Sequence, residues 1–135
     1  MTHVSKQQLE PEHLDQLFIQ LSSSASLLTK KTASGFLDDL LGHEEKIMLA
    51  KRLAAIVMLI EGNSSYRIWQ LLKMSPSTTD KIRLNYEIGK YKNIERIIKS
   101  NKTSYEQFWK TLEIILQANM PPIGRGRWKS VLKRI

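Results

Sequence analysis

The sequence predicts an all-α protein, and two patterns carry that prediction. Apolar residues recur at three- and four-residue spacing in several segments, as on one face of a helix. Val, Ile and Thr nowhere alternate with polar residues over a length that would form a strand. The 135 residues suffice for one compact domain with an appendage and for a core that needs no disulfides. The chain has no cysteine, which excludes thiolate metal sites and disulfide scaffolds.

Two short helices are expected before residue 42. The first covers residues 11–21, where Pro11 suits the first turn and an apolar stripe is formed by Leu14, Leu17, Phe18 and Leu21. The serine-rich residues 22–26 are expected to weaken or interrupt this helix. After a polar connection, a second helix has on one side Phe36, Leu37, Leu40 and Leu41, and Gly42 ends it.

The strongest predicted helix follows, over residues 43–62. Glu44 and Glu45 lie near its start, where the helix dipole favours acidic residues, and Gly62 is placed to end it. Residues 53–60 are apolar on every side but too few to span a membrane, which takes about 20 residues. This segment must therefore be surrounded, either by its own domain or by a second subunit.

Two more helices meet at a short turn between residues 64 and 89. Ser75 can cap the second helix, Pro76 fits its first position and Gly89 can end it. The inward positions are apolar: Ile68, Leu72, Met74, Ile82 and Tyr86. The outward positions of the second helix are polar: Ser77, Thr78, Asp80, Lys81, Arg83 and Asn85. This pattern is typical of a helix-turn-helix with a DNA-reading second helix, and an ordinary corner between two helices explains it equally well.

The last third of the chain is expected to be helical and basic. A short helix is predicted over residues 93–100 and an amphipathic one over 103–118, with Thr103 and Glu106 as a capping box. The apolar face of the longer helix is formed by Tyr105, Phe108, Trp109, Leu112, Ile115 and Leu116.

The excess positive charge lies entirely in that last third. Residues 1–89 hold 10 Lys and Arg against 10 Asp and Glu, whereas residues 90–135 hold 11 against 3, which gives the whole net charge of +8. Such asymmetry favours a polyanionic partner, either nucleic acid or an anionic membrane surface, over a solvated tail. Arg125 and Arg127 alternate with Gly124 and Gly126, and flexible arginines of this kind can enter the DNA minor groove. Trp128 beside them could stack on a base or pack on the preceding helix.

Residues 36–82 carry a series of short motifs in a definite order: Asp39-Leu40-Leu41, Glu44-Glu45, Arg52-Leu53, Glu61-Gly62 and Ser65-Tyr66-Arg67. In order and spacing this segment resembles the Trp repressor-like family, and the resemblance extends over roughly residues 13–89. It implies an intertwined all-helical homodimer whose two reading helices, about residues 76–88, enter successive major grooves of a palindromic or repeated operator. Lys73 stands where that family's turn usually has glycine, so either Lys73 adopts a left-handed conformation or the turn differs.

The resemblance also bears on a ligand. Arg52 matches one arginine that holds tryptophan in the Trp repressor, and Lys81 falls at the other. Ile82 then stands where the repressor has a glycine beside the indole, and its branched side chain would fill the pocket. We therefore expect a protein that does not respond to tryptophan; another effector is not identifiable.

These observations give an expected organisation and function. Residues 1–89 form a Trp repressor-like domain with a helix-turn-helix at about 64–89, and residues 90–135 form a basic helical extension. We expect a cytoplasmic, nucleoid-associated homodimer that binds double-stranded DNA sequence-specifically as a repressor-like transcriptional regulator. The expected DNA contacts are Ser77, Thr78, Lys81, Arg83, Asn85, Arg125 and Arg127.

Other function classes find less support. There is no phosphate loop or nucleophile motif, and His3, His13 and His43 are isolated, so we expect no enzyme, cofactor, metal site or membrane association. Two alternatives remain: a protein-interaction module, or a replication- or chromosome-associated DNA-binding protein that does not regulate a gene.

Overall fold

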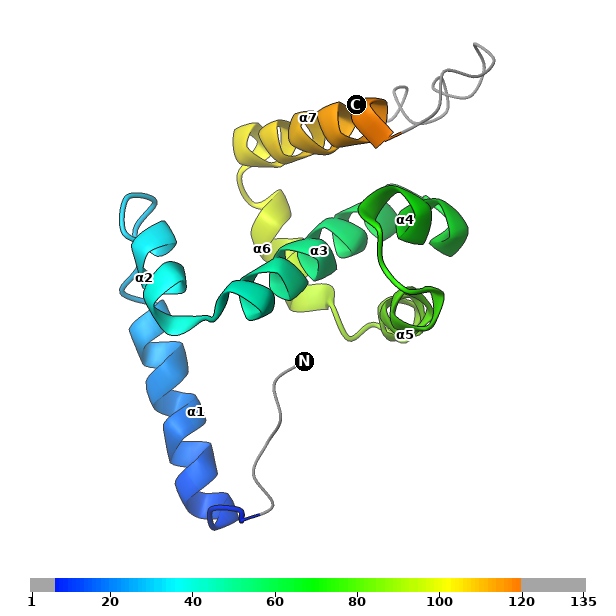
Figure 1. Cartoon of the computed structure of the whole chain (residues 1–135). Helices are drawn as coiled ribbons and strands as arrows, with labels where there is room; N and C mark the ends of the chain where they lie inside the picture. Colours follow the sequence, from blue (N-terminus) through cyan, green and yellow to red (C-terminus); the bar gives the residue numbers. More distant parts are fainter. Residues whose placement is uncertain (1–6, 120–135) are drawn as a thin grey trace. The chain divides into compact units, whose positions relative to one another are not determined.

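The structure is a computed structural model that describes residues 7–119. All regular secondary structure in this part of the chain is α-helical, which confirms the all-α prediction. The helices are α1 (Pro11–Ala25), α2 (Ala33–Leu40), α3 (His43–Ile60), α4 (Ser65–Leu72), α5 (Pro76–Glu87), α6 (Lys92–Lys99) and α7 (Lys102–Asn119) (Figure 1). The described residues form two compact units that divide after Leu49, within α3. The expected division at residue 89 stays a prediction.

The first unit contains α1, α2 and the start of α3. The expected interruption by serines is wrong, because α1 continues through Ser22 to Ala25 and the Ser26 amide still donates to the Ser22 carbonyl at 3.0 Å. Serine has only a modestly lower helix propensity than alanine, so a short run of it extends a helix that is already formed. Neither α1 nor α2 has a buried residue; the apolar side of α1 is exposed, and α2 exposes Leu37 and Leu40 while Phe36 is half-buried.

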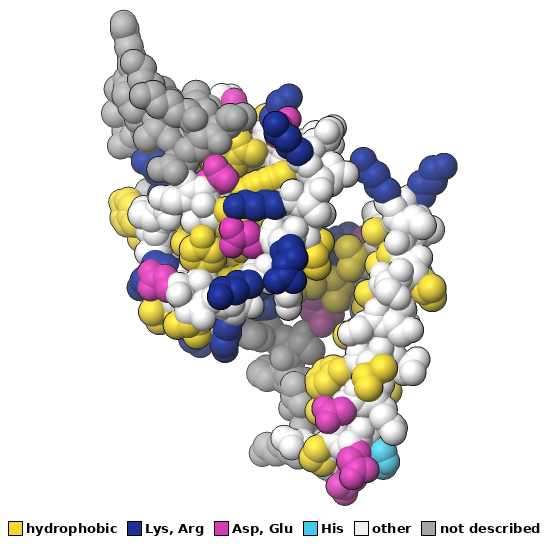
Figure 2. All heavy atoms as spheres, turned by 180° about the vertical axis from the view of Figure 1, so that it is seen from behind, with side chains coloured by type: hydrophobic (Ala, Val, Ile, Leu, Met, Phe, Trp, Pro, Cys, Tyr) yellow, Lys and Arg dark blue, Asp and Glu magenta, His cyan; other side chains and the backbone are white. Residues whose placement is uncertain are grey.

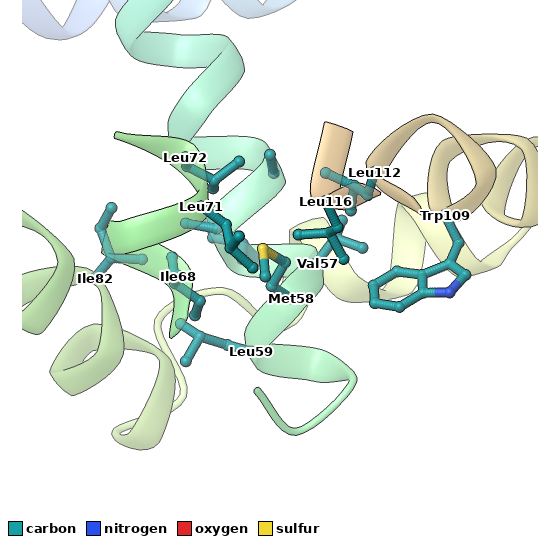
Figure 3. Packing of buried hydrophobic residues seen from close by; sticks show 13 residues of the cluster. Val57, Met58, Leu59, Ile68, Leu71, Leu72, Ile82, Trp109, Leu112 and Leu116 are labelled. Atoms are coloured by element: carbon teal, nitrogen blue, oxygen red, sulfur yellow. The ribbon is translucent and has the colours of Figure 1, made fainter. Parts of the chain in front are cut away.

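The second unit has a continuous hydrophobic core. Residues 54–59 of α3 are all buried, as expected for a segment apolar on every side, and their own chain covers them. The covering side chains come from three other helices: Ile68, Leu71 and Leu72 of α4, Ile82 of α5, and Trp109, Leu112 and Leu116 of α7. Figure 3 shows Leu112 and Leu116 beside Val57 and Met58. Helix α7 is therefore part of this core.

The start of α7 differs from the prediction. Asn101 caps this helix, since its Oδ1 accepts from the Ser104 amide at 3.1 Å and its carbonyl accepts from the Tyr105 amide at 3.0 Å. The expected capping box of Thr103 and Glu106 is wrong, because the helix begins at Lys102 and Thr103 already lies inside the first turn. Asparagine caps helices as well as serine does, so a polar residue two positions upstream was a competing signal.

Candidate nucleic-acid interface

The α4–α5 corner, residues 65–87, is defined by two caps and one strained residue. The Ser64 hydroxyl accepts from the Arg67 amide at 3.2 Å and starts α4. Lys73 ends α4 in the left-handed conformation, with φ 55° and ψ 53°, and is the only non-glycine residue with positive φ in the described chain. Of the two alternatives for the turn, Lys73 thus takes the glycine-like backbone.

A lysine on α3 braces the turn from outside. The Lys51 ammonium donates to the Lys73 carbonyl at 3.0 Å, so it satisfies an acceptor at the end of α4 that no helical amide reaches. The Met74 amide donates to the Trp69 carbonyl at 3.1 Å and closes the last turn. These bonds hold the three residues between α4 and α5 in one arrangement.

Helix α5 begins as the sequence predicts. The Ser75 hydroxyl accepts from the Thr78 amide at 3.1 Å, and Pro76 occupies the first helical position. Thr79 is fully buried, and its hydroxyl donates to the Ser75 carbonyl at 3.0 Å. That bond satisfies the hydroxyl, so a threonine can take a place on the inner face of α5 without leaving a buried polar group unpaired.

The predicted inner face of the corner is confirmed. Ile68, Leu72 and Ile82 are buried, and Met74 and Tyr86 pack half-buried against the same core. Helices α4 and α5 are in direct contact. The outer side of α5 is consequently fixed in orientation by the burial of its inner side.

The predicted contact residues of α5 fall into two groups. Ser77, Thr78 and Lys81 are exposed, and Lys81 makes no ion pair with any residue in the described chain. Arg83 and Asn85 are half-buried at the flanks of the helix. The structure therefore brings the first three together on the open side and sets the other two apart.

Arg83 and Asn85 already have partners within the chain. The Arg83 guanidinium lies 3.0 Å from Glu87 and 3.7 Å from Asp80, one helical turn away on either side. The Asn85 amide donates to the Tyr91 hydroxyl at 3.4 Å. The four-residue spacing of Arg83 and Glu87 was a readable signal for the ion pair. The bond to Tyr91 joins two elements, and no local spacing predicts it.

The centre of the exposed side of α5 contains two residues that the sequence reasoning left out. Ser77, Lys81, Leu84 and Ile88 follow at intervals of four, three and four residues, so they form one stripe along the helix. Leu84 is 51% exposed and Ile88, which caps the helix, is 69% exposed. The stripe lies opposite the inner residues Thr79, Ile82 and Tyr86, and its position on the helix could have been read from the spacing alone.

The second unit presents a surface rich in cations. Figure 2 shows Lys and Arg side chains spread over the face of this unit that is turned to the viewer, with fewer acidic side chains among them. Residues 90–119 contribute six lysines and arginines against three glutamates. Arg125 and Arg127, the other two predicted contacts, lie outside the described residues, as does Trp128.

Two other kinds of site find no support between residues 7 and 119. No group of three His, Cys, Asp or Glu side chains there could hold a metal ion. In the same part of the chain, every helix is too short or too polar to cross a membrane.

Comparison with known proteins adds no assignment to this geometry. No family model matches the sequence, no curated protein is significantly similar to it, and no solved structure is significantly similar to its fold.

Proposed function

We propose that this protein is a sequence-specific DNA-binding regulator of the repressor type, and that the α4–α5 corner is a helix-turn-helix with α5 as its reading helix. One observation supports this above the others: α5 is anchored by its inner face, while the side chains along its opposite face are exposed. A helix that reads the major groove needs this division between a fixed inner side and a free outer side.

The polar part of the outer face suits DNA. Lys81 supplies a cation that forms no ion pair within residues 7–119, and Ser77 and Thr78 supply hydroxyls in the first turn of α5. These groups bond to phosphates or to base edges. Arg83 is exposed enough to exchange its carboxylate partners for a phosphate, since an ion pair within a surface helix contributes only about 0.3–0.5 kcal/mol. The positive charge of residues 90–135 adds affinity for the backbone.

The first unit supports a dimeric form. The apolar stripe of α1 is uncovered, with Leu14 40%, Leu17 54%, Phe18 55% and Leu21 50% exposed. Figure 2 shows hydrophobic side chains along α1, which lies on the right of that view. A second copy of the chain would cover the stripe with an equal one, as two-fold interfaces do. Dimerisation would place two copies of α5 on two half-sites.

The position of Ile82 supports independence from tryptophan. Its side chain is 4% exposed and belongs to the core between α4 and α5. An indole could not lie against α5 at this point without displacing it. The proposed regulator thus depends on an effector of different chemistry or on none.

Selection of bound sequences from a random pool of duplexes tests the proposal, since it measures binding and half-site spacing together. We expect recovery of a repeated or palindromic half-site and a steep fall in affinity with salt, because each neutralised phosphate releases counterions. Lys81→Ala should weaken binding, whereas Lys110→Ala, a change of equal charge at an exposed position of α7, should weaken it less. Absence of duplex binding by the wild-type chain at low salt would overturn the proposal and favour a protein-interaction module.

Binding without any recovered consensus would favour a chromosome-associated protein that coats DNA. In that case the affinity would depend on salt but not on the sequence of the duplex.

A further inference from the structure

The outer stripe of α5 is unusual for a DNA-reading surface because half of it is apolar. From Ser77 to Ile88 the stripe covers about 16 Å along the helix axis, at 1.5 Å per residue. Ser77 and Lys81 make up its first half, and Leu84 and Ile88 its second. The two aliphatic side chains are 51% and 69% exposed, and neither belongs to the core of the second unit.

The side chains that could form hydrogen bonds with bases near Leu84 are engaged elsewhere. Arg83 is held by Glu87 at 3.0 Å, and Asn85 donates to Tyr91 at 3.4 Å. The two residues next to Leu84 in the chain therefore point their polar groups to the flanks of α5. Along the stripe itself, what the helix presents beyond Lys81 is aliphatic surface, whereas the exposed Glu87 lies to one side of it with Arg83.

One group in the DNA major groove matches that surface. Each base pair displays a distinct set of donors and acceptors there, and the only apolar group among them is the C5-methyl of thymine. An aliphatic side chain in contact with this methyl removes apolar surface of both partners from water, whereas against guanine or cytosine it would desolvate polar edges without a bond. We propose that Leu84 and Ile88 read thymine methyl groups, so that each half-site contains thymines at the positions under the second half of α5.

This inference rests on the proposed function, and it adds the chemistry of the bases that are read. Lys81 supports DNA as the occupant of the stripe, because it places a cation without an ion pair in the described part of the chain on the same line of the helix as the aliphatic pair. A purely apolar protein partner would leave this cation desolvated without a counterion.

Duplexes that lack the methyl group test the inference directly. After the preferred half-site has been selected, each thymine is replaced in turn by deoxyuridine, which keeps the base pairing and the hydrogen-bonding edge but removes the methyl. We expect about a fourfold loss of affinity at each thymine that Leu84 or Ile88 contacts, from the burial energy of about 0.8 kcal/mol per carbon. The full-length protein is used throughout.

Variants connect the effect to particular side chains. Leu84→Ala should bind the thymine duplex more weakly and should lose sensitivity to deoxyuridine at one position, and Ile88→Ala should lose it at another. Ile97→Ala is the matched control, since Ile97 is 68% exposed on α6 rather than on α5, and its sensitivity should equal that of the wild type. Circular dichroism verifies that each variant is folded.

The outcomes separate this inference from the function on which it rests. A wild-type chain that binds no duplex contradicts both. Sequence-specific binding that is indifferent to deoxyuridine at every thymine, or that Leu84→Ala and Ile88→Ala leave unchanged, keeps the proposed function and overturns the reading of methyl groups. The aliphatic pair would then be assigned to a protein contact.

Discussion

Tyr105 of α7 donates a hydrogen bond to Glu61 at the end of α3, with 2.6 Å between the hydroxyl and Oε2. The two residues are 44 positions apart, and the bond joins α7 to the turn that leads into α4. Burial raises the pKa of the Tyr105 hydroxyl above its usual value, and the bond to the Glu61 carboxylate raises it further.

Tyr105→Phe removes this bond and keeps the ring. We expect the free energy of unfolding to fall by about 1 kcal/mol, as for a hydrogen bond of a partly buried group. Urea denaturation measures it. Tyr66→Phe is the control, because Tyr66 is 60% exposed and its hydroxyl accepts only from Gln70 on the same helix. Equal effects of the two changes would contradict a special role of the bond.

The same bond gives stability a dependence on alkaline pH. Because the pKa of Tyr105 is higher in the folded than in the unfolded chain, its contribution is fully present below the unfolded value of about 10 and is lost as pH rises above it. Between pH 9 and pH 11 the wild type should therefore lose more stability than Tyr105→Phe. Equal losses of stability in the wild type and in Tyr105→Phe would show that Tyr105 has the same pKa in the folded and the unfolded chain.

The place of α7 in the core predicts a large effect of Leu112→Ala. Leu112 is 1% exposed and packs in the cluster around α3, so its truncation should cost about 2–5 kcal/mol. Ile114→Ala, two positions away at 68% exposure, should change the free energy of unfolding by less than about 0.5 kcal/mol. Thermal and urea unfolding of both variants test whether the packing of α7 in the core contributes to the free energy of unfolding.

The left-handed backbone of Lys73 predicts a stabilising substitution. Lys73→Gly should raise the free energy of unfolding by about 1 kcal/mol, because glycine has no Cβ to clash at φ 55°. The Lys51 brace survives, since it ends on the backbone carbonyl. Lys73→Ala keeps a Cβ and should leave stability nearly unchanged. A destabilised glycine variant would show that Lys73 does not have this conformation in solution.

The exposed stripe of α1 predicts that a charge in it prevents self-association. Leu17→Glu should weaken the dimer about 100-fold or more, because a two-fold interface would contain the buried carboxylate twice. Sedimentation equilibrium measures the dissociation constant. Leu27→Glu is the matched control, as Leu27 is 79% exposed but follows the end of α1. A monomeric wild type would refute the dimer itself.

Helix positions were predictable where capping residues mark them. Ser75 with Pro76 fixed the start of α5 and Gly62 the end of α3, because these residues satisfy helix ends locally. The errors arose where two local signals competed: the serines after Leu21 continued the helix, and Asn101 capped α7 ahead of Thr103. Periodicity also identified which side of α4 and α5 is buried.

The contacts between elements were beyond the sequence. Because residues 53–60 are apolar on every side, the sequence indicates that they are covered but not whether their own domain or a second subunit covers them. Only the packing shows that α7 supplies part of the cover. The hydrogen bond from Asn85 to Tyr91 holds Asn85, a predicted DNA contact, at the flank of α5. It depends on the path of the chain after α5. Such contacts are set by tertiary geometry, which one-dimensional spacing does not encode.

The fully buried Thr79 has a consequence for motion. The Thr79 hydroxyl donates to the Ser75 carbonyl at the start of its own helix rather than to another helix. Helix α5 therefore packs against the core chiefly through Ile82, with Tyr86 half-buried. Helix α4, by contrast, buries three aliphatic side chains in eight residues. Helices with few buried apolar contacts open locally at a lower free energy than the rest of a domain. Amide hydrogens of α5 should accordingly exchange with deuterium earlier than those of α4, and whatever occupies its outer face should slow that exchange.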